Sequence, residues 1–376
     1  MIVIVGGGYA GAATAWSLAR RGHASRVTLI ETEAEAAAHA SGRNAGLIVN
    51  LLEEDPAQLA MSVLGARLLG QWSAAGGVRM RRCGSLQLVP DEDAAERVLE
   101  RSRQHDVPVS VKLTEALARD IQLLEGAPSP LAIACPTDAS LDPALLAKAY
   151  LGVAREAGAR VLLGARLTGI IRQGDRVTGV ETTAGVIEAE WVVNAAGAWA
   201  GQIGLLAGAS DMGLVPYRRH LFFTVEAGGL DPQWPFVWDV PHEVYYRLDG
   251  KRVALSGCDE EPYPAAPPEI SPAAAGDLAR KLELALPVVA TLKIASTRAC
   301  LRTFAPDRRH LIGPDPTTSG LFWVAGLGGS GATASAAAGD LAADLLLGAQ
   351  PRPDLALLAA AFDPSRLAAT QATAEG

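Results

Sequence analysis

The chain has 376 residues, of which 49% are hydrophobic, so its length suits two or three domains with a sizeable core. The net charge of −8 and the 5% aromatic content disfavour a nucleic-acid groove, and four scattered cysteines without a CxxC pair favour neither a zinc site nor a disulfide framework. With a strand beginning at Ile2 and no apolar run approaching roughly 18 residues, we expect a soluble cytoplasmic protein without a membrane segment.

The first 31 residues predict a strand, a glycine turn, a helix and a second strand. The apolar run Met1–Val5 stops at Gly6-Gly7-Gly8-Tyr9-Ala10-Gly11, and residues 12–21 then carry apolar side chains at helical spacing. A second apolar run, residues 27–30, ends on Glu31. An acid at this distance from a glycine-rich turn is typical of a dinucleotide-binding βαβ unit.

Each motif residue has a physical role in such a unit. Gly6 permits the tight turn, Gly8 lets the backbone approach a pyrophosphate, and Gly11 lets helix and strand pack closely. The helix N-terminus presents N–H groups to the anion, and Glu31 accepts hydrogen bonds from a ribose. The acid suits NAD and FAD alike, and the alternative is a parallel sheet that merely turns on glycines.

Residues 32–50 predict a loop with polar groups near its end. Ser41, Arg43 and Asn44 suit a phosphate or a sugar, although Ser41 alone equally suits a helix cap. A helical pattern follows from Pro56 to Trp72, and residues 84–90 predict a short strand closed by proline.

The middle of the chain alternates helical and strand-like patterns. Residues 115–124 and 143–156 are helical by pattern, the second with proline at its first position. The runs 160–163, 167–173 and 177–182 predict a meander of strands. Residues 190–200 form a strand that runs into small residues, which admit a ligand or a neighbouring backbone, and then into a helix.

The residues from 215 onward predict an antiparallel sheet and then a second glycine-rich junction between a strand and a helix. Between residues 215 and 295, aromatic and β-branched runs broken by Gly and Pro predict an antiparallel sheet. The strand 321–326 leads into the glycine cluster 328–331 and a helix to about residue 347, whose N-terminus is expected to face the same cofactor. We assign no chemistry to the tail from Gln350 onward.

Together these segments resemble the FAD-dependent D-amino-acid oxidase superfamily, which includes glycine oxidase, sarcosine oxidase and the D-amino-acid dehydrogenases. The likeness is carried by four blocks in the family's order, residues 4–31, 40–48, 192–200 and 301–333. It implies an α/β fold with a Rossmann-type, GR2-like FAD-binding domain and a second, mostly antiparallel substrate domain. The implied division is 1–80, 140–214 and 296–349 for the FAD-binding domain, 81–139 and 215–295 for the substrate domain, and 350–376 for the tail.

The resemblance also makes FAD the expected cofactor and implies no metal. The residues that it places around FAD come from all four blocks and the strand near residue 167. They are Gly6, Gly8, Ala10, Gly11, Glu31, Thr32, Ser41, Gly42, Arg43, Asn44, Ala45, Gly46, Leu47, Leu167, Ala196, Gly197, Trp199, Gly328, Gly329, Ser330, Gly331, Ala332 and Thr333.

Within the superfamily, three segments are similar to the D-amino-acid dehydrogenases, D-arginine dehydrogenase among them. These segments are residues 193–199, 216–219 and 301–304. The likeness implies that Arg219 and Arg302 clamp the substrate carboxylate and that Tyr246 caps the site. Planar guanidinium groups suit bidentate carboxylate binding, although an arginine without other evidence is more often a solvated surface residue.

Three positions depart from the arginine-preferring relative. Leu47 and Leu52 replace a histidine and a tyrosine, and the glutamate that receives a basic side chain is replaced near Ser85. A cationic side chain needs a carboxylate partner, so the departures favour a smaller or apolar substrate.

The reaction implied is oxidation of the C–N bond of a D-amino acid, or of a small secondary amine, by hydride transfer from Cα to the flavin, giving an imine and then a 2-oxo acid. The arginines act by orienting the substrate. The alternative is an FAD-binding electron-transfer subunit of a larger amine or amino-acid dehydrogenase complex, and the electron acceptor stays open. A domain acting on a modified RNA base is disfavoured by the negative charge.

Cys300 raises a separate question about the cofactor. The spacing of residues 300–307 matches the Cys-x-x-Thr-x-x-Pro-Asp segment of the sarcosine-oxidase branch, in which the cysteine is linked to the flavin 8α-methyl. Such a bond needs a thiolate, and we expect Arg298 and Arg302 to favour one by lowering the thiol pKa. The alternative is a cysteine that only packs in a strand.

Overall fold

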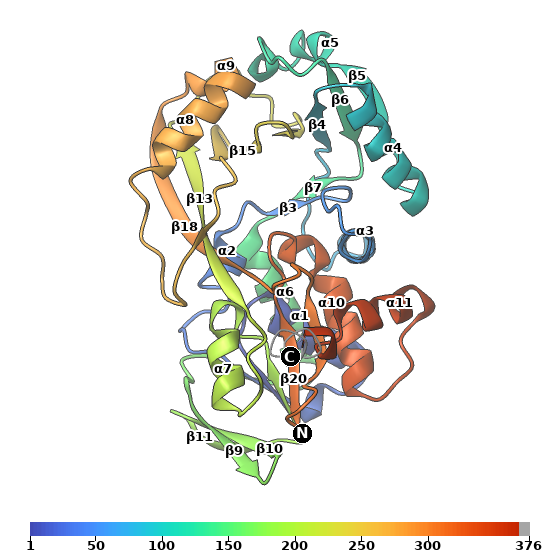
Figure 1. Cartoon of the computed structure of the whole chain (residues 1–376), viewed down its shortest axis with the longest axis vertical. Coiled ribbons are helices and arrows are strands. Elements are labelled where there is room, and N and C mark those ends of the chain that lie inside the picture. The colour runs from blue at the N-terminus through green and yellow to red at the C-terminus, as the bar shows by residue number, and fades with distance from the viewer. Residues whose placement is uncertain (368–376) are drawn as a thin grey trace, which may run out of the picture.

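The computed structural model describes residues 1–367, which form two large sheets and two small ones. The first large sheet has six strands, parallel except for β19 at one edge. In sheet order, they are β19 (Leu311–Pro314), β20 (Leu321–Ala325), β12 (Trp191–Asn194), β1 (Ile2–Val5), β2 (Val27–Ile30) and β8 (Arg160–Leu162). This sheet lies in the lower half of Figure 1.

The centre of this sheet follows from the predicted βαβ unit. β1 is buried along its whole length and pairs in parallel with β2 on one side and β12 on the other. Its residues are Ile and Val, which suit a strand covered on both faces. Helix α1 (Tyr9–Arg20) returns the chain between the two strands.

Alanine-rich helices cover the parallel sheet. α1 packs against α10 (Gly331–Leu346), and a Cβ on Gly339 of α10 would lie 2.5 Å from the Ala13 carbonyl oxygen, so glycine permits this close crossing. Ser17 of α1 and Arg21, which follows α1 directly, donate to the buried carboxylate of Asp340 in α10 at 2.8 and 2.9 Å and so give it partners.

The other helices cover the two large sheets and their connections. They are α2 (Ala40–Arg43), α3 (Pro56–Ala74), α4 (Glu92–His105), α5 (Thr114–Ala118), α6 (Pro143–Glu156), α7 (Ala200–Leu206), α8 (Ala274–Ala285), α9 (Pro287–Ala290) and α11 (Pro353–Phe362), with short 3₁₀ turns at Ala24–Arg26, Gln122–Leu124 and Gly197–Trp199. α3 begins with Asp55 as its N-cap, whose carboxylate accepts from the N–H groups of Ala57 and Gln58.

The second large sheet has nine strands and is antiparallel except where β14 meets β4. Its strands are β17 (Glu261–Pro262), β13 (Val215–Thr224), β16 (Arg252–Ser256), β15 (Val244–Asp249), β14 (Phe236–Asp239), β4 (Ser85–Val89), β6 (Leu131–Cys135) and β5 (Ser110–Leu113), and β18 (Ile294–Phe304) pairs with β13. The structure confirms the predicted α/β fold with a parallel sheet and a mostly antiparallel second sheet.

Two long strands connect the regions of the two sheets. β13 and β18 pair from Val215 opposite Phe304 to Thr224 opposite Ile294, and both extend from the upper part of Figure 1 into the lower part. β18 runs across the predicted domain boundary at residues 295 and 296. The division into domains stays a prediction, but this strand is placed to carry side chains from the second sheet toward the first.

The two small sheets correct two details of the predictions. The predicted meander is formed by β9 (Leu167–Gln173), β10 (Arg176–Thr182) and β11 (Gly185–Glu188), whereas the run from Arg160 joins the parallel sheet as β8, because it pairs with β2. The predicted loop 32–50 contains helix α2 and the strand β3 (Leu47–Ile48), which pairs with β7 (Ala139–Ser140).

The described part of the tail is packed rather than free. Helix α11 buries Leu355, Leu358 and Phe362 and contacts α3 and β19. The rest of the predicted tail, residues 368–376, lies outside the described residues. Among the helices of residues 1–367, none has the length and apolar character that crossing a membrane requires.

Candidate active site

A cavity of about 670 Å³ extends between the glycine turn of the parallel sheet and the inner face of the nine-stranded sheet. Its wall combines the turn after β1, the α2 segment, the end of β12, strand β18 and the junction between β20 and α10. A volume of this size lies within the range of small-molecule and cofactor sites. The cavity therefore brings together segments from every block on which the sequence prediction rests.

The turn after β1 can only be built with glycine at two of its positions. Gly6 has a φ of +109°, and a Cβ there would lie 2.5 Å from the Ala195 carbonyl oxygen. A Cβ on Gly11 would lie 2.0 Å from the carbonyl oxygen of Gly6 itself. Bare backbone at both positions lets the N-terminus of α1 face the cavity close to the end of β12.

The carboxylate of Glu31 is held directly against this turn. It accepts a hydrogen bond from the Gly7 N–H at 2.7 Å and another from the Glu33 N–H at 2.9 Å. These bonds fix the orientation of an acceptor that lines the cavity at the end of β2. The geometry suits recognition of ribose hydroxyl groups beside a pyrophosphate site.

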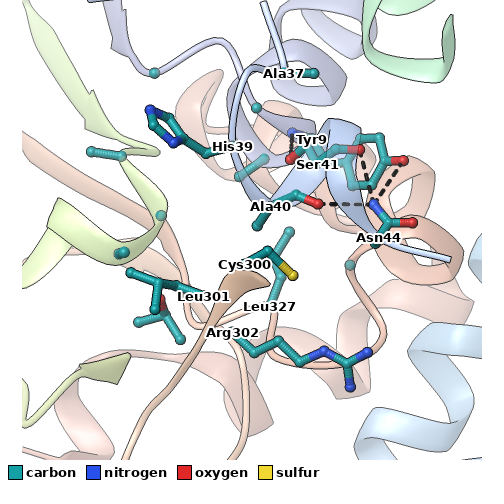
Figure 2. A pocket seen from close by; sticks show the side chains of 18 of the residues that line it. Tyr9, Ala37, His39, Ala40, Ser41, Asn44, Cys300, Leu301, Arg302 and Leu327 are labelled. Atoms are coloured by element: carbon teal, nitrogen blue, oxygen red, sulfur yellow. Dashed lines mark hydrogen bonds between the residues drawn. The ribbon is translucent and has the colours of Figure 1, made fainter. Parts of the chain in front are cut away.

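Helix α2 adds polar groups above the N-terminus of α1. The Tyr9 N–H donates to Ser41 Oγ at 2.9 Å, and Asn44 Nδ2 donates to the Tyr9 hydroxyl at 3.3 Å and to the Ala40 carbonyl at 3.0 Å. Figure 2 shows these side chains together on one side of the cavity, with Arg302 extending from β18 on the other. Ser41 thus acts across two helices and does not cap α2.

Most of the predicted cofactor-binding residues line this cavity. They are Gly6, Gly8, Ala10, Glu31, Thr32, Ser41, Arg43, Asn44, Ala45, Leu47, Leu167, Ala196, Gly197, Trp199, Gly328, Gly329, Ser330, Gly331, Ala332 and Thr333. Gly11, Gly42 and Gly46 lie behind the wall, where a Cβ on Gly42 or Gly46 would meet the Ala37 or Leu141 carbonyl oxygen at 2.2 or 2.1 Å. Those three glycines permit close packing of the segments that form the wall.

Arg302 lies in the cavity wall with its guanidinium beside the second glycine cluster. A Cβ on Gly329 would lie 3.2 Å from Arg302 Nη1, and the side chain is partly buried. Among residues 1–367, no acid lies within ion-pair distance of this guanidinium and no hydrogen-bond acceptor pairs with it. A planar cation placed in this way suits an anionic ligand such as a carboxylate.

Arg219 lies on the same face of the sheet but is engaged by the protein itself. Its Nη2 donates to Glu260 Oε1 at 2.7 Å, and Arg308 binds the same carboxylate at 2.9 and 3.0 Å. Arg219 is 6% exposed and does not line the cavity. Burial lowers the pKa of Arg219, and the charge of Arg302 nearby adds to this effect. The structure thus places the two predicted arginines near each other, but only Arg302 at the cavity.

The tyrosine that lines the cavity is Tyr245, one residue before the predicted Tyr246. Successive side chains of a strand point to opposite faces, so Tyr246 packs in the core behind the sheet, fully buried, while Tyr245 lines the cavity. Burial raises the pKa of Tyr245, against the opposing charges of Arg302 and Arg219. Its ring stacks on Trp238 at 5.1 Å, which gives this side of the cavity an apolar surface.

Cys300 lines the cavity from β18, two residues before Arg302. Burial raises the pKa of its thiol, and this effect outweighs the opposing charges of Arg302 and Arg219. Arg302 thus acts on this pKa in the predicted direction, but burial is the larger effect and the pKa is raised overall. The link to flavin stays a prediction, and the protonated thiol favours the packing alternative.

Several residues at the cavity were not predicted. Glu53 comes from the connection between β3 and α3, Trp238 from β14, and residues 266–268 from the connection between β17 and α8. Glu53 begins the acidic run Glu53-Glu54-Asp55, which resembles a solvated helix start, so nothing in the local pattern distinguishes Glu53 from its two neighbours. Within residues 1–367, no group of three or more acids, histidines or cysteines is arranged to hold a metal ion.

Known proteins similar to this chain share its whole length or part of it. The glycine oxidase of Pseudomonas aeruginosa is 29% identical over 93% of this chain and 95% of its own. A hydrogen cyanide synthase subunit of the same organism is 30% identical over 60% of this chain, but this match spans only 54% of that subunit. The crystal structure of L-proline dehydrogenase from P. horikoshii has a TM-score of 0.86, with 23% identity and 98% of both chains covered, which shows a shared fold.

The residues at the cavity fit FAD. The cavity is continuous from the bare glycine turn and the fixed Glu31 carboxylate, which suit an adenine dinucleotide, to the face of the nine-stranded sheet, where a flavin and a substrate would meet. The family described as FAD dependent oxidoreductase, the D-amino-acid oxidase or DAO family, matches residues 1–345. This chain therefore belongs to that family of FAD-dependent oxidoreductases, as its glycine blocks predicted.

Proposed function

We propose that this enzyme oxidises the C–N bond of a small D-amino acid, or of a small secondary amine that carries a carboxylate, to the imine, which then hydrolyses to a 2-oxo acid. The observation that carries the proposal is Arg302, whose guanidinium lies in the wall of the cavity and forms no ion pair with any acid among residues 1–367. A desolvated arginine of this kind binds a carboxylate with two parallel hydrogen bonds. The D configuration rests on the resemblance to D-amino-acid dehydrogenases.

The chain's part in the reaction is to hold and orient the substrate. Arg302 holds the carboxylate, and Tyr245 and Trp238 form a rigid apolar wall beside it. Arg219 becomes a second contact when the substrate carboxylate displaces Glu260, to which it is bound at 2.7 Å. Bound FAD supplies the acceptor for two electrons and a proton. Orientation of the Cα–H bond toward that acceptor is the rate advantage that these side chains provide.

The size and polarity of the wall limit the substrate's side chain. Leu47 and Leu52 line the cavity where the resemblance implies a histidine and a tyrosine in the arginine-preferring relative. Together with Trp238 they present an apolar surface, which favours a small or apolar side chain over a cationic one.

A second candidate is an FAD-binding subunit that passes electrons within a larger complex. The match to a hydrogen cyanide synthase subunit supports it. Anaerobic mixing of the purified yellow protein with D-amino acids, glycine, sarcosine and proline separates the two. We expect the flavin absorbance to bleach with at least one carboxylate-bearing amine. Flavin that stays oxidised with every amine contradicts the proposed function and favours the subunit.

A further inference from the structure

Two groups of opposite charge lie in the wall of the same cavity without pairing with each other. Arg302 comes from β18, and Glu53 comes from the connection between β3 and α3. Among the described residues, the Glu53 carboxylate has no ion-pair partner, and the Ser330 hydroxyl lies close enough to lower the pKa of this carboxyl. Arg302 is close enough for its charge to act on that carboxylate.

The position of Glu53 is not explained by the start of helix α3. Asp55 is the N-cap of that helix and also binds Arg309 at 2.6 Å, and Glu54 is exposed to solvent. Glu53 alone of the three acids is turned into the cavity. A carboxylate that is withdrawn from water without a cationic partner lowers stability, so a ligand contact is the natural reason for its position.

The groups that face Glu53 come from three parts of the structure. Arg302 and Arg308 approach it from β18 and the turn that follows, Asp55 from the start of α3, and Ser330 from the second glycine cluster. Burial raises the pKa of Glu53 above its ordinary value, while Ser330 and the two arginines oppose that rise.

Behind Ser330 lies a group that does not compete for a proton. The Nε2 atom of His310 is 3.4 Å from Ser330 Oγ, and burial lowers the pKa of this histidine to about 3. His310 is therefore neutral at physiological pH. Because the pKa of Glu53 is raised and that of His310 is lowered, Glu53 is the better proton acceptor of the two groups beside Ser330.

We propose that Glu53 recognises the amino group of the substrate and accepts its proton while Arg302 holds the carboxylate. In this step an N–H bond of the ammonium breaks, an O–H bond forms on the Glu53 carboxylate, and the nitrogen keeps the electron pair. The nitrogen electron pair forms the C=N bond of the imine as the hydrogen on Cα leaves as a hydride. The inference rests on the proposed function and makes Glu53 the residue that separates amino acids from 2-hydroxy acids, which carry the carboxylate but no ammonium group.

The test compares two neighbouring acids in the FAD-bound enzyme. Glu53→Gln keeps the shape of the side chain but removes the charge, and the exposed Glu54→Gln is the matched control. Anaerobic stopped-flow reduction across pH gives the substrate Kd and the reduction rate, and calorimetry gives the Kd of acetate, which has a carboxylate but no amine. We expect Glu53→Gln to raise the Kd of the amino acid at least tenfold and to remove the acid limb of the pH profile of the reduction rate. Acetate binding should change less than twofold, and Glu54→Gln should match the wild type in every measurement.

Three other outcomes overturn the inference in distinguishable ways. An unchanged Kd and pH profile in Glu53→Gln removes Glu53 from substrate recognition. If Glu53→Gln loses acetate binding and amino-acid binding equally, Glu53 has a structural role. The variant Glu53→Asp, which retains the charge on a shorter side chain, checks this role. A wild-type enzyme that 2-hydroxy acids reduce and amines do not contradicts the proposed function itself, whatever the variants do.

Discussion

The two ends of the cavity differ in whether main-chain atoms or side chains form the wall. At the nucleotide end the wall is mainly backbone and small residues, because Gly6, Gly8 and the cluster from Gly328 leave room for a ligand against the main chain. At the sheet end the wall consists of large side chains, above all Trp238 and Tyr245 from the consecutive strands β14 and β15 and Arg302 from the more distant strand β18.

This difference explains how each end tolerates change. A backbone site has little freedom, since a Cβ on Gly6 or Gly11 would meet a carbonyl oxygen, and its requirement is visible as glycine in the sequence. A side-chain site depends on strand register and on which face each residue occupies. We therefore expect substitutions at the nucleotide end to act on the fold and the cofactor, and those at the sheet end to act on the substrate alone.

The largest effect is expected for Gly11→Ala. The new Cβ would lie 2.0 Å from the Gly6 carbonyl oxygen, so the β1 to α1 turn must shift, at a cost of about 3 kcal/mol in the free energy of unfolding. FAD binding should be lost with it. The control is Gly152→Ala in α6, where nothing lies within 4 Å of the new atom, and where we expect a gain of about 0.5 to 1 kcal/mol. Thermal unfolding and flavin content measure both, and normal flavin content in Gly11→Ala would contradict the account of this turn.

At the sheet end, Arg302→Lys should affect only the substrate. Lysine keeps the charge but loses the two-pronged geometry, so we expect kcat/KM to fall about 100-fold, equivalent to about 2.7 kcal/mol, with full FAD occupancy. Arg298→Lys is the control, since Arg298 lies on the same strand, is exposed and stacks on Phe223 at 4.8 Å. If both variants lose activity equally, the specific role of Arg302 is wrong.

A smaller effect on the cofactor is expected for Glu31→Ala. The variant removes the acceptor fixed by the Gly7 and Glu33 N–H groups and leaves the glycine turn in place, so the Kd for FAD should rise about tenfold. Glu35→Ala, which removes only an exposed ion pair with Lys148, should leave it unchanged. Flavin per chain after dialysis reports both, and full occupancy in Glu31→Ala would argue against ribose recognition by this acid.

Cys300→Ser should have the smallest effect. Because burial raises the thiol pKa, we expect no flavin–cysteine bond, and acid precipitation should leave a colourless pellet and yellow supernatant for both the wild type and the variant. A wild-type pellet that stays yellow, beside a colourless Cys300→Ser pellet, would instead establish the bond.

The nucleotide end could be predicted from the sequence better than the sheet end, because it depends on local backbone features and the sheet end depends on strand register. The glycine turns, the strands on either side and Glu31 are local features, and the structure places nearly all of them at the cavity. The tyrosine was displaced by one residue because a strand's inward face is set by its partners, and β8 left the expected meander because it pairs with β2.

The other missing information was long-range. The binding of Arg219 by Glu260 depends on a contact between β13 and the connection after β16, 41 residues apart. The role of Glu53 was hidden among three consecutive acids whose environments differ only in the folded chain. Neither is encoded in a local pattern, so composition and spacing could not reveal them.

The most direct test of the central claim pairs each amino acid with the amine that lacks its carboxylate. Glycine and methylamine, D-alanine and ethylamine, sarcosine and dimethylamine, and D-proline and pyrrolidine are mixed anaerobically with the wild-type enzyme, and flavin absorbance is followed. If Arg302 anchors the substrate, at least one amino acid reduces the flavin and its decarboxylated partner is slower by about 100-fold or more. Equal reduction by both members of every reactive pair would show that the carboxylate is not recognised and would contradict the claim.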